Sequence, residues 1–155
     1  MSKILVAYFS ATGRTKEKAE IIAKEAKADL FEITPKEKYS GNDLNWSDNN
    51  SRCVKEHKKQ IMPEIAKKIE NMNEYEIIFL GYPIWWGTAP NVIKNFLMSY
   101  DFSNKIIIPF YTSGGTPNLA IELHKLCSTK TKWKMAKMIN LANNEKIQDW
   151  VRKNI

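Results

Sequence analysis

Three short, almost uninterrupted apolar runs constrain the fold of this chain more than any other feature of its sequence. They occupy residues 4–9, 77–81 and 106–110 and are rich in Ile, Val and Phe. Strands that are buried on both faces have this pattern, whereas strands with one solvent-exposed face alternate apolar and polar residues. The runs therefore predict central strands of a parallel sheet with helices on both faces.

Helical spacing fills the stretches between the runs. One apolar stripe at i, i+3, i+4, i+7 follows the first run: Ala19, Ile22, Ala23 and Ala26. Further helices are expected to begin at or beside four residues suited to a first turn or cap: Pro63, Pro90, Pro117 and Asn144. Weaker strands are expected at residues 30–33 and 133–139. Strand and helix thus alternate five times, which predicts one doubly wound α/β domain over residues 1–155.

Composition narrows the class of protein. The length of 155 residues suits one domain, and 43% hydrophobic residues exclude wholesale disorder. No apolar run nears the roughly 18 residues that cross a bilayer, and no signal-peptide pattern opens the sequence. We therefore expect a cytoplasmic protein without membrane insertion. Cys53 and Cys127 form no CxxC pair, so two reduced thiols and no metal site are expected.

The net charge of +7 is concentrated near the end of the chain. Residues 124–155 hold eight Lys or Arg against two acids, a difference of +6. Such a field attracts acidic partners or anionic cofactors. Because no nucleic-acid-binding motif accompanies it, no nucleic-acid partner is expected. His57 and His124 are expected to be surface residues, and the long irregular segment 34–61 to be either functional or disordered.

A loop dense in hydroxyl groups follows the first apolar run. It reads Ser10, Ala11, Thr12, Gly13, Arg14 and Thr15. A helix start directly after it would present unpaired N–H groups and a positive dipole end to a phosphate. The loop lacks the GxxxxGK[ST] and GxGxxG patterns, so a terminal monophosphate fits it better than ATP or NAD. A turn that merely caps the helix is the alternative.

Two further loops follow the other apolar runs. Residues 81–90 read GYPIWWGTAP, in which Trp85 and Trp86 offer planar faces beside Gly87. Stacking on a flat heterocycle is one interpretation, and rings that only cover the end of the sheet are the other. Residues 111–117 combine hydroxyl side chains and glycines in a pattern typical of a turn. Alone this pattern is weak evidence for a ligand site, because such turns are common at strand-to-helix junctions. Because ligands of doubly wound sheets bind beyond the carboxyl ends of the strands, function is expected in these loops.

Together the three loops resemble the FMN-binding loops of flavodoxins. Ser-Ala-Thr-Gly-Arg-Thr resembles their phosphate loop, S/T-x-T-G-x-T. Gly-Tyr-Pro-Ile-Trp-Trp-Gly and Thr-Ser-Gly-Gly resemble the second and third flavin loops of short, single-domain bacterial flavodoxin-like proteins, as do residues 43–46 and 51–52. The resemblance covers essentially the whole chain. It implies a flavodoxin-like three-layer sandwich, with a five-stranded parallel sheet in the order 2-1-3-4-5 and helices on both faces.

The resemblance also implies FMN as the cofactor and a set of binding residues. The FMN phosphate would lie on Ser10, Thr12, Gly13, Arg14 and Thr15. The ring would lie against Pro83, Ile84, Trp85, Trp86 and Gly87. Its pyrimidine edge would lie near Thr112, Ser113, Gly114 and Gly115. Gly87 is the candidate for the residue whose backbone responds when flavin N5 is protonated on reduction. Because a bound flavin carries the chemistry, no catalytic side chain is assigned.

Two departures from the family leave the activity open. Electron-shuttle flavodoxins are acidic, whereas this chain has a pI near 9.3. The family also commonly places an aromatic residue in the third loop, and residues 112–120 contain none. The second flavin face is then either open to a nicotinamide or quinone, or closed by Tyr39 or Trp46.

We expect an FMN oxidoreductase that accepts electrons or hydride from NAD(P)H or a reductase and reduces a small acceptor such as a quinone. A one-electron carrier with an acidic protein partner is the alternative, and a non-catalytic binding module of the same fold is a third. The oligomeric state, a homodimer included, is left open.

Overall fold

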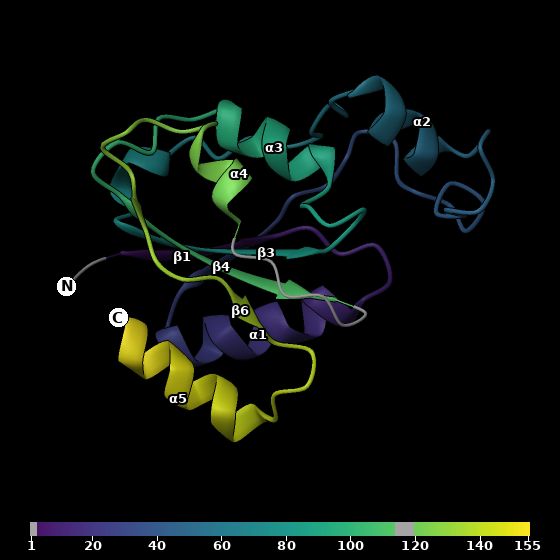
Figure 1. Ribbon diagram of the computed structural model, residues 1–155. Helices are drawn as coiled ribbons and strands as arrows, with labels where there is room; N and C mark the ends of the chain where they lie inside the picture. The colour runs from purple at the N-terminus through teal and green to yellow at the C-terminus, as the bar shows by residue number, and fades with distance from the viewer. Residues whose placement is uncertain (1–2, 114–119) are drawn as a thin grey trace.

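A parallel sheet forms the centre of the computed structural model, which describes residues 3–113 and 120–155 (Figure 1). Its strands lie side by side in the order β2 (Asp29–Glu32), β1 (Ile4–Tyr8), β3 (Ile77–Pro83), β4 (Ile106–Thr112) and β5 (Lys132–Trp133). All neighbouring pairs are parallel. The order 2-1-3-4-5 confirms the predicted flavodoxin-like α/β fold.

The last strand is interrupted, although the sequence predicts one strand over residues 133–139. Trp133 of β5 pairs with Ile107, and Lys137 of β6 (Lys137–Met138) pairs with Phe110. The four residue steps from Trp133 to Lys137 thus lie opposite the three steps from Ile107 to Phe110 on β4. The extra residue breaks the pairing in the manner of a bulge, which is common at sheet edges.

Helices cover both faces of the sheet, as predicted. On one face α1 (Arg14–Ala26) packs beside α5 (Asn144–Asn154). The other face carries α3 (Asn91–Met98) and α4 (Ile121–His124) (Figure 1). The predicted stripe of α1 is buried throughout: Ala19, Ile22, Ala23 and Ala26. None of the helices in the described part of the chain is long and apolar enough to cross a membrane.

The helix expected from Pro63 does not form in residues 61–71, all of which the structure describes. This stretch is irregular apart from one antiparallel bridge between Ile65 and Pro35, and a short 3₁₀ helix, η1 (Met72–Glu74), follows it. Its backbone pairs elsewhere: Lys36 donates its N–H to the carbonyl of Glu64 over 2.8 Å. Pairing with the chain after β2 therefore satisfies backbone groups that a helix would have used, and it overrides the helical spacing.

Three smaller features also differ from expectation. The segment 34–61 is not wholly irregular, because it contains α2 (Arg52–Lys59). Asn143 rather than Asn144 caps α5, since its side chain accepts the N–H of Lys146 over 2.8 Å. Pro90 stands at the cap position of α3, one residue before the helix. Pro117 lies outside the described residues.

Candidate functional site

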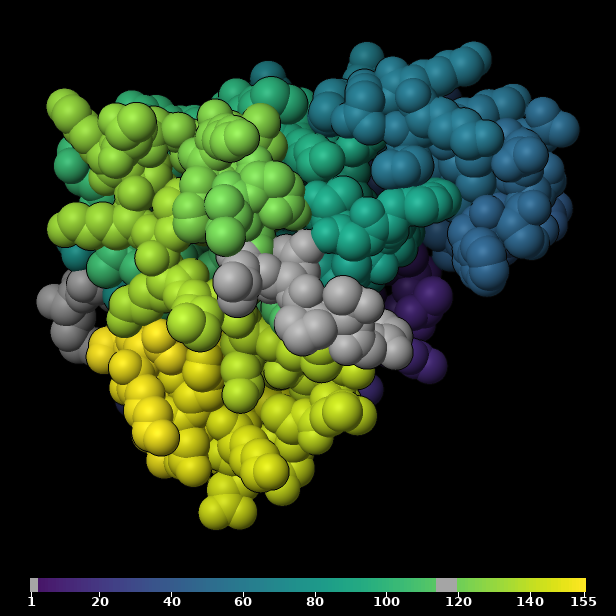
Figure 2. Space-filling view, viewed as in Figure 1, coloured from purple at the N-terminus to yellow at the C-terminus, as the bar shows by residue number. Residues whose placement is uncertain are grey.

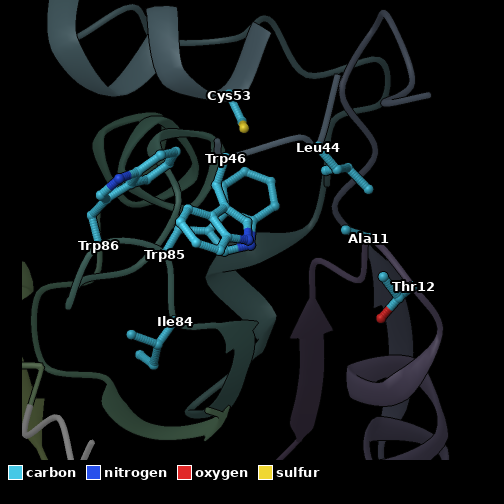
Figure 3. A pocket seen from close by; sticks show the side chains of 8 residues that line it. All are labelled: Ala11, Thr12, Leu44, Trp46, Cys53, Ile84, Trp85 and Trp86. Atoms are coloured by element: carbon cyan, nitrogen blue, oxygen red, sulfur yellow. The ribbon is translucent and has the colours of Figure 1, made fainter. Parts of the chain in front are cut away.

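A cavity of about 390 Å³ opens between the first loop, the loop after β3 and the segment around α2 (Figure 3). Its walls are formed by Ala11, Thr12, Leu44, Trp46, Cys53, Ile84, Trp85 and Trp86. Segments far apart in sequence thus meet around one cavity beyond the carboxyl ends of β1 and β3. This is where a doubly wound fold is expected to bind its ligand.

The first loop shapes the start of α1. Gly13 has a φ of 96°, in the left-handed region that favours glycine. Its N–H donates to Ser10 Oγ over 3.0 Å, so the Ser10 hydroxyl belongs to the turn itself. Thr12 lies in the cavity wall, and the exposed Arg14 begins the helix. The loop therefore sets a hydroxyl and a helix N-terminus at one side of the cavity.

A buried contact joins the first loop to the third. Thr15 Oγ1 and Thr112 Oγ1 lie 3.1 Å apart, and both side chains are buried. The carbonyl of Thr112 also accepts the N–H of Ile84 over 2.9 Å. Next to it, Ser113 exchanges two hydrogen bonds with the Asn140 side chain, at 3.3 and 3.1 Å. The three loops are therefore tied together at Thr112. Two predicted residues lie outside the described residues: Gly114 and Gly115.

The loop after β3 is a tight turn with unusual backbone angles. Trp85 and Thr88 exchange backbone hydrogen bonds of 2.8 and 3.1 Å. The two residues between them, Trp86 and Gly87, have φ values of 50° and 74°. Positive φ at both central positions is the signature of a type I′ turn. For a non-glycine residue such as Trp86 this costs about 1–2 kcal/mol, and such strain gathers at functional sites.

The side chain of Trp85 is held rigidly from behind. Its ring meets Phe9 and Tyr39 edge-on, with centroid distances of 5.6 and 5.4 Å. Tyr39 donates its hydroxyl to the buried carboxylate of Glu56. Arg52 places its guanidinium 3.9 Å from the centroid of the Tyr39 ring and donates Nε–H to Glu56 over 2.9 Å. Burial, and then the hydrogen bond to Glu56, raises the pKa of Tyr39.

Trp46, and not Tyr39, is the aromatic residue of the long segment that faces the cavity. Tyr39 is absent from the cavity wall and is committed to the packing behind Trp85. Trp46 stands in the wall with 76% of its surface exposed. The local chain is fixed because Asn45 Oδ1 accepts both the N–H and the hydroxyl of Ser47, at 3.1 and 2.7 Å. Trp46 can therefore cover the outer side of a ligand.

The cavity wall also contains residues that the sequence did not single out. Leu44 lies in the stretch 43–46 that resembles the subfamily but is given no role by the sequence, and Cys53 is expected only to be a reduced thiol. The Cys53 side chain is buried, 3.6 Å from Ser51 Oγ. The other predicted and described site residues lie in the loops or at the ends of the strands and helix beside them, but not in the wall: Ser10, Gly13, Arg14, Thr15, Pro83, Gly87, Thr112 and Ser113.

Comparison with known proteins decides the family. The sequence model of the flavodoxin family matches residues 3–154. This chain belongs to the flavodoxin family. A "putative flavoprotein" from Bacteroides eggerthii is 36% identical, with a TM-score of 0.90 over 99% of this chain and 98% of that one. A "putative flavoprotein" from Bacteroides uniformis is also 36% identical, with a TM-score of 0.91 over 97% and 98% of the two chains.

A more distant flavoprotein shares the fold. It comes from Lactobacillus acidophilus, was solved in complex with FMN, and is 22% identical, with a TM-score of 0.69 over 97% of this chain and 99% of that one. No curated protein is similar enough to count as a match.

The two histidines of this flavodoxin-family chain, which the sequence predicts to be surface residues, each stack on a tryptophan. His57 stacks on Trp86 with a centroid distance of 4.5 Å and an angle of 5° between the planes. His124 stacks on Trp133 at 4.4 Å and 26°, and burial lowers its pKa. Both side chains are half-buried.

Proposed function

We propose that this chain binds FMN in the cavity and acts as an oxidoreductase that passes electrons from NAD(P)H to a small acceptor such as a quinone. One observation carries the proposal. Three tryptophans, Trp46, Trp85 and Trp86, share a single cavity with Thr12 of the hydroxyl-rich loop (Figure 3). A ligand with a flat ring and a phosphate matches both parts of that wall.

The chemistry of the wall fits FMN. Aromatic and aliphatic side chains dominate it, and Cys53 is its one ionisable group among the described residues. A flat heterocycle is bound by such surfaces through stacking and apolar burial. Near Thr12 the start of α1 provides N–H groups and a positive dipole end for a phosphate. The FMN complex of the Lactobacillus relative, which has the same fold, supports this choice.

When bound, the flavin supplies the electron or hydride transfer. The residues of the chain bind and orient it. Trp85 is held edge-on from two sides, so it offers a fixed face. The Thr15 to Thr112 contact fixes the phosphate loop relative to the third loop. We assign Gly87, in the strained turn, as the backbone group that faces flavin N5. We also propose Trp46 as the cover of the outer face, in place of an aromatic residue in the third loop.

A one-electron carrier is the second candidate, and the charge distribution favours it. Figure 2 shows that residues 120–155, coloured light green to yellow, make up a large part of one face of the molecule. The stretch 124–155 within it holds eight basic and two acidic residues. Such a face would attract an acidic protein partner. We place either activity in the cytoplasm, where two free thiols such as Cys53 and Cys127 stay reduced.

Anaerobic reduction separates the two candidates. The FMN-loaded protein is mixed with NADH or with NADPH, and the visible flavin absorption is followed. Rapid bleaching, reversed by a quinone, is the expected result for the oxidoreductase. Bleaching by dithionite but by neither nucleotide would favour the carrier. A purified protein that neither contains FMN nor takes it up would exclude both.

A further inference from the structure

The imidazole of His57 lies directly behind Trp86. Their rings are almost parallel, 5° apart in angle and 4.5 Å between centroids. Trp86 stands in the wall of the large cavity, whereas His57 does not. Both residues border a small gap between α2 and the loop after β3. The indole therefore separates His57 from the cavity.

His57 is the ring partner that holds Trp86. Trp85 has two edge-on aromatic neighbours, but the only ring packed on Trp86 among the described residues is His57. Trp86 is 42% exposed and sits on a backbone with positive φ. The stack on His57 is therefore the ring contact that supports the indole in the cavity wall.

The stack responds to the charge of the imidazole. The face of an indole ring is electron-rich and attracts a cation placed over it. A histidine side chain changes charge between about pH 5 and 8. A charged His57 therefore binds the indole more strongly than a neutral one.

The other ionisable groups around the stack are engaged or lie on its rim. Glu56 and Cys53 of α2 border the same gap, and the Glu56 carboxylate bonds two other side chains. Lys58 reaches the side-chain oxygen of Asn49. From α4, Glu122 accepts the hydroxyl of Thr88 in the loop after β3 over 2.7 Å. Among the described residues, the ionisable group stacked on the indole itself is His57.

We propose that His57 is a positioning residue for Trp86, and that its charge sets how tightly this chain holds FMN and how readily the bound flavin is reduced. The proposal rests on the proposed function. A charged His57 fixes the indole in the cavity wall and places a cation behind it, which favours the electron-rich reduced flavin. FMN affinity and reduction potential should both rise as His57 gains its proton.

The first test uses the cofactor-free protein. The indole N–H signal of Trp86 and the ring signals of His57 are followed by NMR from pH 5 to 8. Both are expected to move with one midpoint in the wild type. In His57→Phe, which keeps a flat ring without charge, the indole signal should not titrate. His124→Phe makes the same change at the other stack and should leave the Trp86 titration unchanged.

The second test measures FMN affinity and the flavin potential over the same pH range. The FMN phosphate also titrates here, so each variant is compared with the wild type at every pH. The wild type should gain about two- to fivefold in affinity on acidification beyond the change seen in His57→Phe. His57→Arg, which keeps a flat cation at all pH values, should behave at pH 8 as the wild type does at pH 5.

Two results would overturn the proposal: a Trp86 signal that ignores the charge of His57, or the same pH dependence of FMN affinity and potential in wild type and His57→Phe. If no variant binds FMN at any pH, the proposed function fails. The NMR titration still decides then whether His57 controls Trp86, so the two failures are distinguishable.

Discussion

The hydroxyl oxygens of Thr15 and Thr112 lie 3.1 Å apart in the protein interior, although 97 residues separate them in sequence. Thr15 lies in the first turn of α1, and Thr112 ends β4. One buried hydrogen bond therefore fixes the first loop against the third loop. Removing one partner leaves the other buried and unpaired, which costs more than removing both.

A double-mutant cycle tests that contact. Thr15→Val and Thr112→Val should each lower the free energy of unfolding by about 1–3 kcal/mol. The double variant should lose less than the sum of the two, since it leaves no orphaned hydroxyl. Urea unfolding of the four proteins measures the difference. Strictly additive losses would show that the two hydroxyls do not interact.

Trp46→Ala separates ligand binding from folding. The side chain is 76% exposed, so its removal should leave the free energy of unfolding nearly unchanged. FMN binding should weaken by about 0.5–1.5 kcal/mol, because one stacking face is lost. Fluorescence titration with FMN measures this. Leu141→Ala is the matched control, since Leu141 is 88% exposed and does not stand in the cavity wall. Equal losses of FMN affinity in both variants would show that Trp46 does not cover the ligand.

Trp86→Ala and Thr12→Ala change opposite parts of the same cavity wall (Figure 3). Both should weaken FMN binding, each on the order of 1–3 kcal/mol. Only Trp86→Ala should shift the flavin potential, because the phosphate lies far from the ring. Potentials measured against reference dyes check this. Equal shifts in the two variants would contradict the placement of ring and phosphate.

The sequence predicts this fold well because the signals that define it are local. Near-continuous apolar runs report burial on both faces, and the stripe on α1 reports its packed side. The helix expected at Pro63 fails for the opposite reason. Its apolar spacing is helical, but the backbone pairs with residues 34–36, a contact that no local pattern announces.

The candidate site divides in the same way. Thr12, Ile84, Trp85 and Trp86 follow strands directly, so strand ends and loop chemistry lead to them. Cys53 and Trp46 reach the cavity through α2 and its preceding loop, and the sequence names Trp46 only as an alternative to Tyr39. The position of this segment depends on the Arg52, Glu56 and Tyr39 contacts. Such contacts can be understood only once the structure brings the three side chains together.

Arg52→Met tests whether these contacts anchor the long segment. Arg52 and Glu56 form a largely buried pair, with 20% and 9% of their side chains exposed. Removing the cation leaves the Glu56 carboxylate buried with one fewer partner, which should cost about 3–5 kcal/mol of unfolding free energy. Arg152→Met removes a more exposed pair with Glu25 and should change it little. Urea unfolding compares the two variants, and similar losses would show that the buried pair is no anchor.

The thiol of Cys127 provides a test of burial on the face opposite α1. Burial raises its pKa from 9.0 to about 11, so at pH 8 its thiolate fraction should be about a hundredfold lower than that of an unperturbed thiol. Only the thiolate reacts with iodoacetamide. The alkylation rate of Cys127, followed by peptide mass spectrometry, should rise about tenfold per pH unit until pH approaches 11. Limited access would slow the reaction equally at every pH. An alkylation rate that levels off near pH 9 would therefore show that the pKa of Cys127 is not raised, and that only limited access of the reagent slows the reaction.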